Sequence, residues 1–95
     1  MAALSLPGCA AAAYGPQDAI NDIRSNFHFD KASDADFRNA ARSTCDALTQ
    51  GSPGVIDVLV SARVTLNDLT VDEAYQLIGF EVRGFCPENL PKLKT

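Results

Sequence analysis

The stretch LTVDEAYQLIGFEVRGFCP, residues 69–87, decides the fold that this sequence predicts. It opens with Thr70 and Glu73 at the spacing of a capping box, in which each side chain accepts a hydrogen bond from the backbone N–H of the other residue. Apolar residues then recur at the spacing of one helix face, and Pro87 prevents the helix from continuing. We therefore expect a well-defined helix that ends at Cys86.

Three further helices are expected before this one, because apolar residues again recur at helical spacing. The first covers about residues 16–27, and the second runs from about residue 33 to a stop at Gly51. The third begins with Ser52 as its capping residue. Its apolar run VIDVLV, residues 55–60, also suits a strand, but the entry and the neighbouring segments favour a helix. No segment alternates apolar and polar residues over the length of a strand, so we expect an all-α fold, a compact bundle of about four short helices.

Two glycines, Gly79 and Gly84, fall inside the last predicted helix. A glycine in a helix interior costs about 1 kcal/mol relative to alanine, so each position needs an explanation. Contact with a partner is one alternative. Close packing of a neighbouring helix within the domain is the interpretation that we favour.

The chain of 95 residues is long enough for one small domain, which we place at residues 14–90, followed by a tail at 91–95. Its net charge of −4 and its scattered Lys and Arg residues argue against nucleic-acid binding, which requires clustered positive charge. No apolar run approaches the length of about 18 residues that a membrane-spanning helix needs.

The segment MAALSLPGCAAAA, residues 1–13, differs from the rest because it carries no charged residue. An apolar run that ends in small residues is typical of a secretory signal peptide, although the basic residues that usually open one are missing. Cleavage after Ala13 would leave a mature chain that begins near Tyr14. Alternatively, Leu6–Cys9 resembles a bacterial lipobox, in which Cys9 would receive a lipid anchor. A retained N-terminal segment is the third alternative.

Two of the three cysteines are expected to form a disulfide. Cys45 lies on the apolar face of the second predicted helix and Cys86 at the end of the fourth, and a bundle can bring them within the Cα separation of about 5.5 Å that a bridge requires. Such a bridge would stabilise the domain by about 4 kcal/mol in the chain-entropy account. The signal-like segment favours this pairing, since disulfides persist in oxidising compartments. Two free, buried cysteines are the alternative.

The segments ARSTCDALTQGS (residues 41–52) and LTVDEAYQLIGFEVRGFCP (residues 69–87), with the apolar start, resemble the small secreted proteins of mycobacteria and their phages grouped as domain of unknown function 732. The resemblance covers roughly residues 20–87, and the positions that carry it are Cys45, Leu48, Gly51, Ala74, Phe80, Val82, Phe85, Cys86 and Pro87. It implies an exported, all-helical domain with a single disulfide and no assigned activity. Many members are Ala-rich before the Cys-Pro, where this chain has Glu81 and Arg83, and this difference suggests a more charged outer face.

The residue patterns of an enzyme or a metal site are missing from the sequence. His28 is the only histidine, and its position between Phe27 and Phe29 is more typical of a half-buried loop residue than of a catalyst. The acidic run DKASDAD, residues 30–36, lacks the glycine and the bidentate glutamate of a calcium loop and is better explained as helix capping. Without a C-x-x-C or H-x-x-x-H pair, we expect no catalytic residue, no cofactor and no metal.

The function that these observations favour is binding without catalysis. We expect an exported module at the mycobacterial cell envelope, with an unidentified protein or envelope component as its partner. The candidates for partner contact are aromatic, namely Tyr14, Tyr75, and the exposed parts of Phe27 and Phe29. One alternative is a phage-encoded lipoprotein, anchored through Cys9, that blocks the entry of competing phages. Another is a virion or cytosolic structural protein that shares the fold and keeps residues 1–13.

Overall fold

A computed structural model describes residues 13–93, which form four α-helices and one 3-10 helix and contain no strand. The elements are α2 (Pro16–Asn26), α3 (Asp34–Gln50), α4 (Val55–Asn67), α5 (Val71–Phe85) and η1 (Pro87–Leu93). The expected all-α bundle with one disulfide is therefore confirmed. Cys9 and nearly all of the expected signal segment lie outside the described residues.

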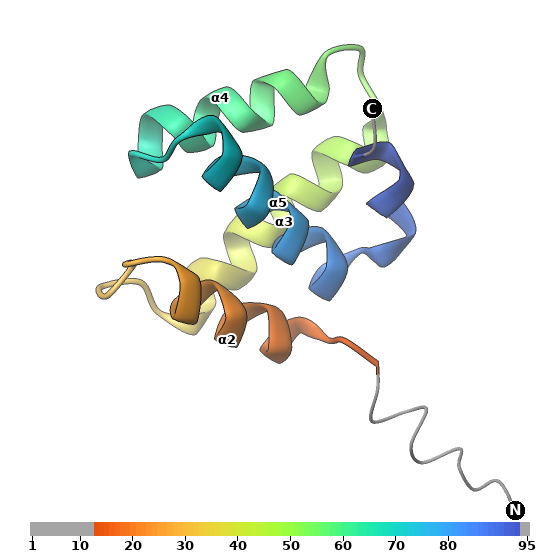
Figure 1. The fold of residues 1–95 in the computed structure, drawn as a ribbon. Helices are drawn as coiled ribbons and strands as arrows, with labels where there is room; N and C mark the ends of the chain where they lie inside the picture. The colour runs from red at the N-terminus through yellow and green to blue at the C-terminus, as the bar shows by residue number, and fades with distance from the viewer. Residues whose placement is uncertain (1–12, 94–95) are drawn as a thin grey trace, which may run out of the picture.

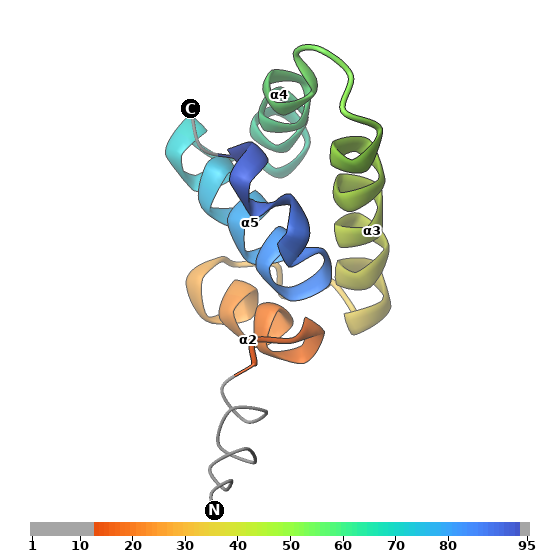
Figure 2. The same ribbon diagram turned by 90° about the vertical axis from the view of Figure 1, so that its right-hand side faces the viewer.

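Helix α5 is the central element of the bundle. It packs against α2, α3, α4 and η1, while α2 and α4 lie at opposite ends of the molecule with α5 between them (Figures 1 and 2). Its predicted capping box is present: the Glu73 backbone N–H donates to Thr70 Oγ1 at 3.1 Å, and the Thr70 backbone N–H donates to Glu73 Oε1 at 2.9 Å. The stretch of residues 69–87 thus contains the helix around which the others are placed.

Helix α3 begins and ends as its sequence predicts, but α4 begins later. Ser33 caps α3 by accepting from the backbone N–H of Asp36, and Gly51 ends it in the left-handed conformation with φ of 68°. The expected start of the third helix at Ser52 is wrong, because Gly54 takes a second left-handed conformation, with φ of 76°, and becomes the N-cap of α4. Ser52 instead accepts a hydrogen bond from the backbone N–H of Val55 at 3.1 Å, which closes a tight turn between the helices.

The core consists of two apolar clusters that meet at α5. One surrounds the disulfide and contains Cys45, Leu48, Val60, Ala74, Ile78, Val82 and Cys86. The other lies between α2 and the first half of α3 and contains Ile20, Ile23, Phe27, Phe37 and Leu77. Phe85 packs against both clusters and connects them.

Of the two glycines in α5, only Gly84 is required by close packing. A Cβ added at Gly84 would overlap the Cβ of Ala19 and would lie 3.1 Å from the carbonyl oxygen of Gly15, so α2 crosses α5 at this point. A Cβ added at Gly79 would meet no heavy atom within 4 Å. The close-approach interpretation therefore holds for Gly84 and fails for Gly79.

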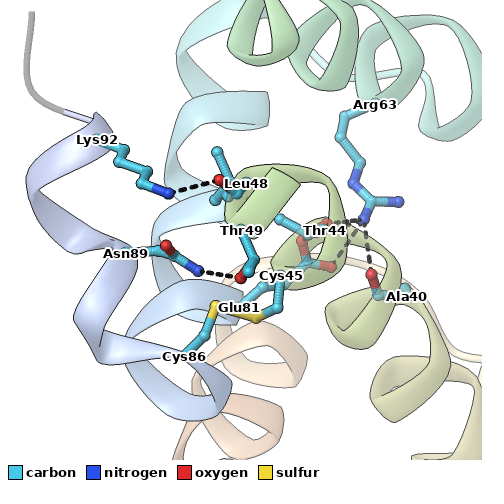
Figure 3. Close-up of a disulfide and its surroundings, with 10 residues drawn as sticks. All are labelled: Ala40, Thr44, Cys45, Leu48, Thr49, Arg63, Glu81, Cys86, Asn89 and Lys92. Carbon is cyan, nitrogen blue, oxygen red and sulfur yellow. Dashed lines mark hydrogen bonds and ion pairs between the residues drawn. A yellow bond between two sulfur atoms is a disulfide. The ribbon is translucent and has the colours of Figure 1, made fainter. Parts of the chain in front are cut away.

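Sequence reasoning assigned no helix after Pro87, yet this segment forms η1 and folds back onto α3. The side chain of Asn89 is buried, and its Nδ2 donates to Thr49 Oγ1 at 3.2 Å (Figure 3). Lys92 Nζ donates to the carbonyl oxygen of Leu48 at 2.7 Å. The expected tail thus starts within an element that covers the disulfide cluster, to which it also contributes partly buried leucines.

Candidate functional site

The disulfide between Cys45 and Cys86 joins the second half of α3 to the end of α5 (Figure 3). Their Cα atoms lie 6.0 Å apart, and 41 positions of sequence separate them. Both residues are buried, with 9% and 3% of their surface exposed. The bond therefore acts on the stability of the domain rather than as an accessible redox group.

A buried ion pair joins α4 to α5 and α3. Arg63 Nη2 lies 3.1 Å from both carboxylate oxygens of Glu81, and it also donates to Thr44 Oγ1 at 2.8 Å (Figure 3). The Thr44 hydroxyl donates to Glu81 Oε1 at 2.8 Å. The expectation that Glu81 lies on a charged outer face is wrong, because Arg63 compensates its charge inside the bundle and leaves it only 2% exposed.

Burial raises the pKa of the Glu81 carboxyl, while Arg63 and the Thr44 hydroxyl act in the opposite direction. A perturbed carboxyl can indicate an active site, but it must reach a substrate to act as an acid or base. Only 3% of the Glu81 side chain is exposed, at the wall of a small cavity of about 150 Å³ that Arg63 also lines. The arrangement fixes three helices to one another.

Tyr14, a candidate for partner contact, is fixed at the junction of α2 and α5. Its hydroxyl donates to Asp22 Oδ2 at 2.6 Å, and the guanidinium of Arg83 lies 4.3 Å from its ring centroid. Burial and the Asp22 carboxylate raise the pKa of the phenol. Its ring is therefore already engaged, although part of it remains at the surface.

The other aromatic candidates differ in how much surface they offer. Phe27 is only 6% exposed, because it belongs to the second apolar cluster and stacks on Phe29 with the ring centroids 5.6 Å apart. The expectation that part of Phe27 is exposed for partner contact is therefore wrong. Phe29 is half-buried and also packs on Phe37. Tyr75 is 37% exposed and is the most accessible of the four.

Two open grooves flank α4. One, of about 500 Å³, lies between the α2–α3 loop and the α4–α5 turn and is lined by residues 26–29, 66–69 and 73. The other, of about 530 Å³, lies beside Tyr75 at the start of α4, with Lys92 of η1 on its border. The first groove brings His28 near the α4–α5 turn, and the second gives Tyr75 an apolar neighbourhood that includes Val55 and Ile56.

Two large aliphatic side chains are exposed on the outward side of α4, beside Ser61 and Thr65, and sequence reasoning did not single them out. At 3.6 residues per turn, one side of α4 carries Val58, Ala62, Thr65 and Leu66, a set that we call the α4 outer face. Val58 is 67% exposed and Leu66 is 77% exposed. The signal was present in the sequence, because the apolar residues of VIDVLVSARVTLN are spread around the helix rather than gathered on one side.

Two classes of site were sought within residues 13–93 and not found. No three His, Cys, Asp or Glu side chains in this range are grouped so that they could hold a metal ion. None of the helices described there has the length and apolar character needed to cross a membrane.

Comparison with known proteins identifies a family and no individual relative. A family model described as "Protein of unknown function (DUF732)" matches residues 12–88. Searches of curated proteins and of solved structures gave no match. The matched range contains all four α-helices and both cysteines of the disulfide, and it ends within η1.

Proposed function

This chain belongs to the DUF732 family of proteins of unknown function, and we propose that it is an exported, non-catalytic binding module of the mycobacterial cell envelope. The observation that carries the proposal is the α4 outer face. Two branched aliphatic side chains, Val58 and Leu66, are more than half exposed on a helix side that carries no charge. Apolar side chains gathered on one exposed side of an element mark interaction surfaces.

The α4 outer face offers enough apolar surface to stabilise a complex. Complete burial of a Val or Leu side chain is worth about 1.5–3 kcal/mol, so Val58 and Leu66 together can act as anchors of an interface. Tyr75 borders the neighbouring groove and adds an amphipathic aromatic group of the kind enriched at interfaces. Tyr75 thus keeps its role as a candidate contact, in a different setting from the one the sequence suggested.

The disulfide supports export as the setting of this function. Disulfides persist in oxidising compartments and are rare in the cytosol, and small secreted domains depend on them because their cores are limited. A buried bridge between the second and fourth predicted helices fits that pattern.

A photo-crosslinking experiment in a mycobacterial host tests this proposal. A crosslinking amino acid replaces Leu66 on the α4 outer face, and in a matched control it replaces Asn39, an exposed residue of α3. With the whole gene expressed, we expect its product in the envelope fraction, without residues 1–13, and a discrete crosslinked species from position 66 only. A cytosolic product with free thiols, or the same crosslinking at both positions, would overturn the proposal.

Intact mass of the same purified material separates the alternatives. A diacylglyceryl group on Cys9 would favour the phage-exclusion lipoprotein. A full-length chain with every thiol free would favour the virion or cytosolic structural protein. A chain that lacks residues 1–13 and two hydrogens is the result that we expect.

A further inference from the structure

We propose that the small cavity beside Arg63 binds a phenol group, that is, one six-membered aromatic ring that carries a hydroxyl. The cavity has a volume of about 150 Å³ and lies where the α2–α3 loop meets the first half of α3, the second half of α4 and the middle of α5. Neither Val58 nor Leu66 lines it, so this site is separate from the α4 outer face.

Two buried polar atoms at this cavity have no hydrogen-bond partner. Arg63 Nε is a donor and Asn67 Oδ1 an acceptor, and neither is bonded to any atom of residues 13–93. Nearly all buried polar atoms in proteins are paired, so these two need an explanation. The residues lie four positions apart on α4, which makes their side chains neighbours on one side of the helix. Because they do not bond to each other, a third group that both accepts and donates would pair them.

A hydroxyl is the smallest organic group that suits both atoms. Its oxygen accepts from the Nε–H of Arg63, and its hydrogen is donated to Asn67 Oδ1. A carboxylate only accepts and an ammonium group only donates, so each would leave one of the two atoms unpaired. A charged ligand also lacks a counter-charge, because Glu81 lies 3.1 Å from Arg63 Nη2 and already compensates it (Figure 3). The polar end of the ligand is therefore neutral.

The other walls of the cavity are apolar and partly aromatic. They come from Phe29 and Ala32 of the α2–α3 loop, Phe37 and Ala40 of α3, and Leu77 of α5. The rings of Phe29 and Phe37 are tilted by 49° with their centroids 6.2 Å apart, and a third ring can pack on such a pair in the arrangements that aromatic groups favour. A water molecule would suit the two polar atoms but not these walls. The walls therefore favour a hydroxyl attached to a ring.

The volume limits the ligand to a single ring. An apolar cavity of about 150 Å³ accommodates one benzene molecule. An amide in place of the hydroxyl would supply the same two hydrogen bonds, but it would add two heavy atoms to a ring that already fills this volume. Of the groups that pair both polar atoms and contact the apolar walls, phenol is the one whose size agrees with the cavity.

The cavity is open to the surface on one side. Of the residues that line it, Asp36 is exposed, whereas Phe37, Leu77 and Glu81 are buried. With its hydroxyl at the buried polar atoms, a phenol would direct the opposite carbon of its ring toward the opening. Two sources have this chemistry: a free small phenol, and the end of a tyrosine side chain of another protein.

An NMR titration of the purified, disulfide-bonded protein tests the proposal with four probes. The probe p-cresol has the ring and the hydroxyl, toluene has the ring alone, p-methylanisole has an oxygen that only accepts, and benzamide has an amide in place of the hydroxyl. Binding is followed by the chemical shifts of the backbone amides. We expect p-cresol to shift amides of residues 36–40 and 63–67, which border the cavity. It should bind about tenfold more tightly than toluene and about threefold more tightly than p-methylanisole, because it forms two hydrogen bonds instead of none or one.

Two variants and a matched control locate the site. Ala40→Leu fills the cavity and should weaken p-cresol binding by about tenfold or more. Ala47→Leu makes the same change at a half-buried position about two turns further along α3, away from the cavity, and should leave the affinity within about twofold. Asn67→Leu removes the acceptor at similar volume, so it should weaken p-cresol about three- to tenfold and leave toluene within about twofold. This variant is expected to fold, because the buried acceptor that it removes has no partner within residues 13–93.

A fifth probe, N-acetyltyrosinamide, distinguishes the two sources of the phenol group. If it binds and Asn67→Leu weakens it as it weakens p-cresol, the site takes a tyrosine side chain of a partner protein. If p-cresol binds and N-acetyltyrosinamide does not, the site takes a free small phenol. Both results support a phenol site.

Each of the other outcomes overturns the inference. Equal affinities for p-cresol and toluene would show that the two polar atoms do not recognise the ligand, and tighter binding of benzamide would assign the cavity to an amide. Failure of every probe would assign it to water alone. Binding that Ala40→Leu leaves unchanged would place the probe elsewhere. The role of the α4 outer face is judged separately, by the position-66 crosslink in the host.

Discussion

Loss of the disulfide is the perturbation whose size follows most directly from the structure. The bond between Cys45 and Cys86 closes a loop with a sequence separation of 41, and in the chain-entropy account a loop of about forty residues is worth about 4 kcal/mol. Domains of this kind have a free energy of unfolding of about 5–15 kcal/mol in total. Reduction should therefore remove a large part of the stability, and the melting temperature should fall by about 15–30 °C.

The loss should also be local to one part of the fold. Beyond Cys86, η1 is held on α3 by the bonds from Asn89 to Thr49 and from Lys92 to the carbonyl oxygen of Leu48. Two hydrogen bonds with a net worth of about 1 kcal/mol each do not replace the bridge. Hydrogen exchange at the backbone of η1 should therefore accelerate before exchange in α2 does.

Urea unfolding of three samples measures the effect. The oxidised protein is compared with the reduced protein and with the variant Cys45→Ala/Cys86→Ala. The reduced protein isolates the loop term, and the alanine variant adds the small cost of two lost sulfur atoms in the disulfide cluster. The argument that the bridge holds this bundle together would be refuted if the free energies of unfolding of the reduced and oxidised proteins differed by less than about 1 kcal/mol. The comparison requires that the free energy falls with urea concentration at the same slope in both samples.

Three other predictions test the packing of α5. Gly84→Ala should lower the free energy of unfolding by about 1–3 kcal/mol, because the added Cβ meets α2. Gly79→Ala should raise it by about 1 kcal/mol. Equal effects of the two variants in urea unfolding would contradict the close approach of α2 to α5 at Gly84. Arg63→Ala should lower the free energy of unfolding by about 3–5 kcal/mol, since it leaves Glu81 buried without its counter-charge. Arg24→Ala, which removes an exposed ion pair, should lower it by less than about 1 kcal/mol. Similar losses in the two variants would show that burial does not matter here. Burial raises the pKa of Glu81 in the folded chain, so its contribution to stability is present below its unfolded pKa, near 4.5, and is lost as pH rises through the folded pKa. The variant Glu81→Gln should therefore lack a decline in stability above pH 4.5. A pH profile of stability that is the same in the variant and in the unmodified protein would count against this assignment.

Local sequence signals predicted a helix boundary correctly where one short stretch determines it. The capping box at Thr70, the start of α3 near residue 33 and the stop at Gly51 need only a few neighbouring residues, and each is present as expected. The start of α4 was missed because two consecutive turn signals competed. Ser52-Pro53 looks like a helix entry, but Gly54 can take a positive φ, and the chain uses it.

The disulfide could be predicted from the sequence, but the ion pair could not. The difference is whether the sequence indicates that the two residues of each pair are buried. Cys45 lies on an apolar stripe and Cys86 at a helix end, so their burial is visible from the sequence. Glu81 looks like a surface residue because its partner, Arg63, is 18 positions away on another helix. Whether a charge is buried depends on the orientation of that second helix, which no local pattern specifies. For the same reason η1 was missed, since its contacts are with α3, some 40 positions earlier.

The buried ion pair bears on the candidate site because it decides which side of α4 faces outward. A helix whose apolar residues are spread around it has little preference for one orientation, and in α4 only Val60 is buried. Rotation by one residue, about 100°, would remove Arg63 from Glu81 and leave a buried charge uncompensated, which costs about 3–5 kcal/mol. Polar contacts of this kind can select one arrangement among several apolar ones. The Arg63–Glu81 pair therefore fixes Val58 and Leu66 at the surface, so the contact that looks purely structural is what presents the proposed binding surface.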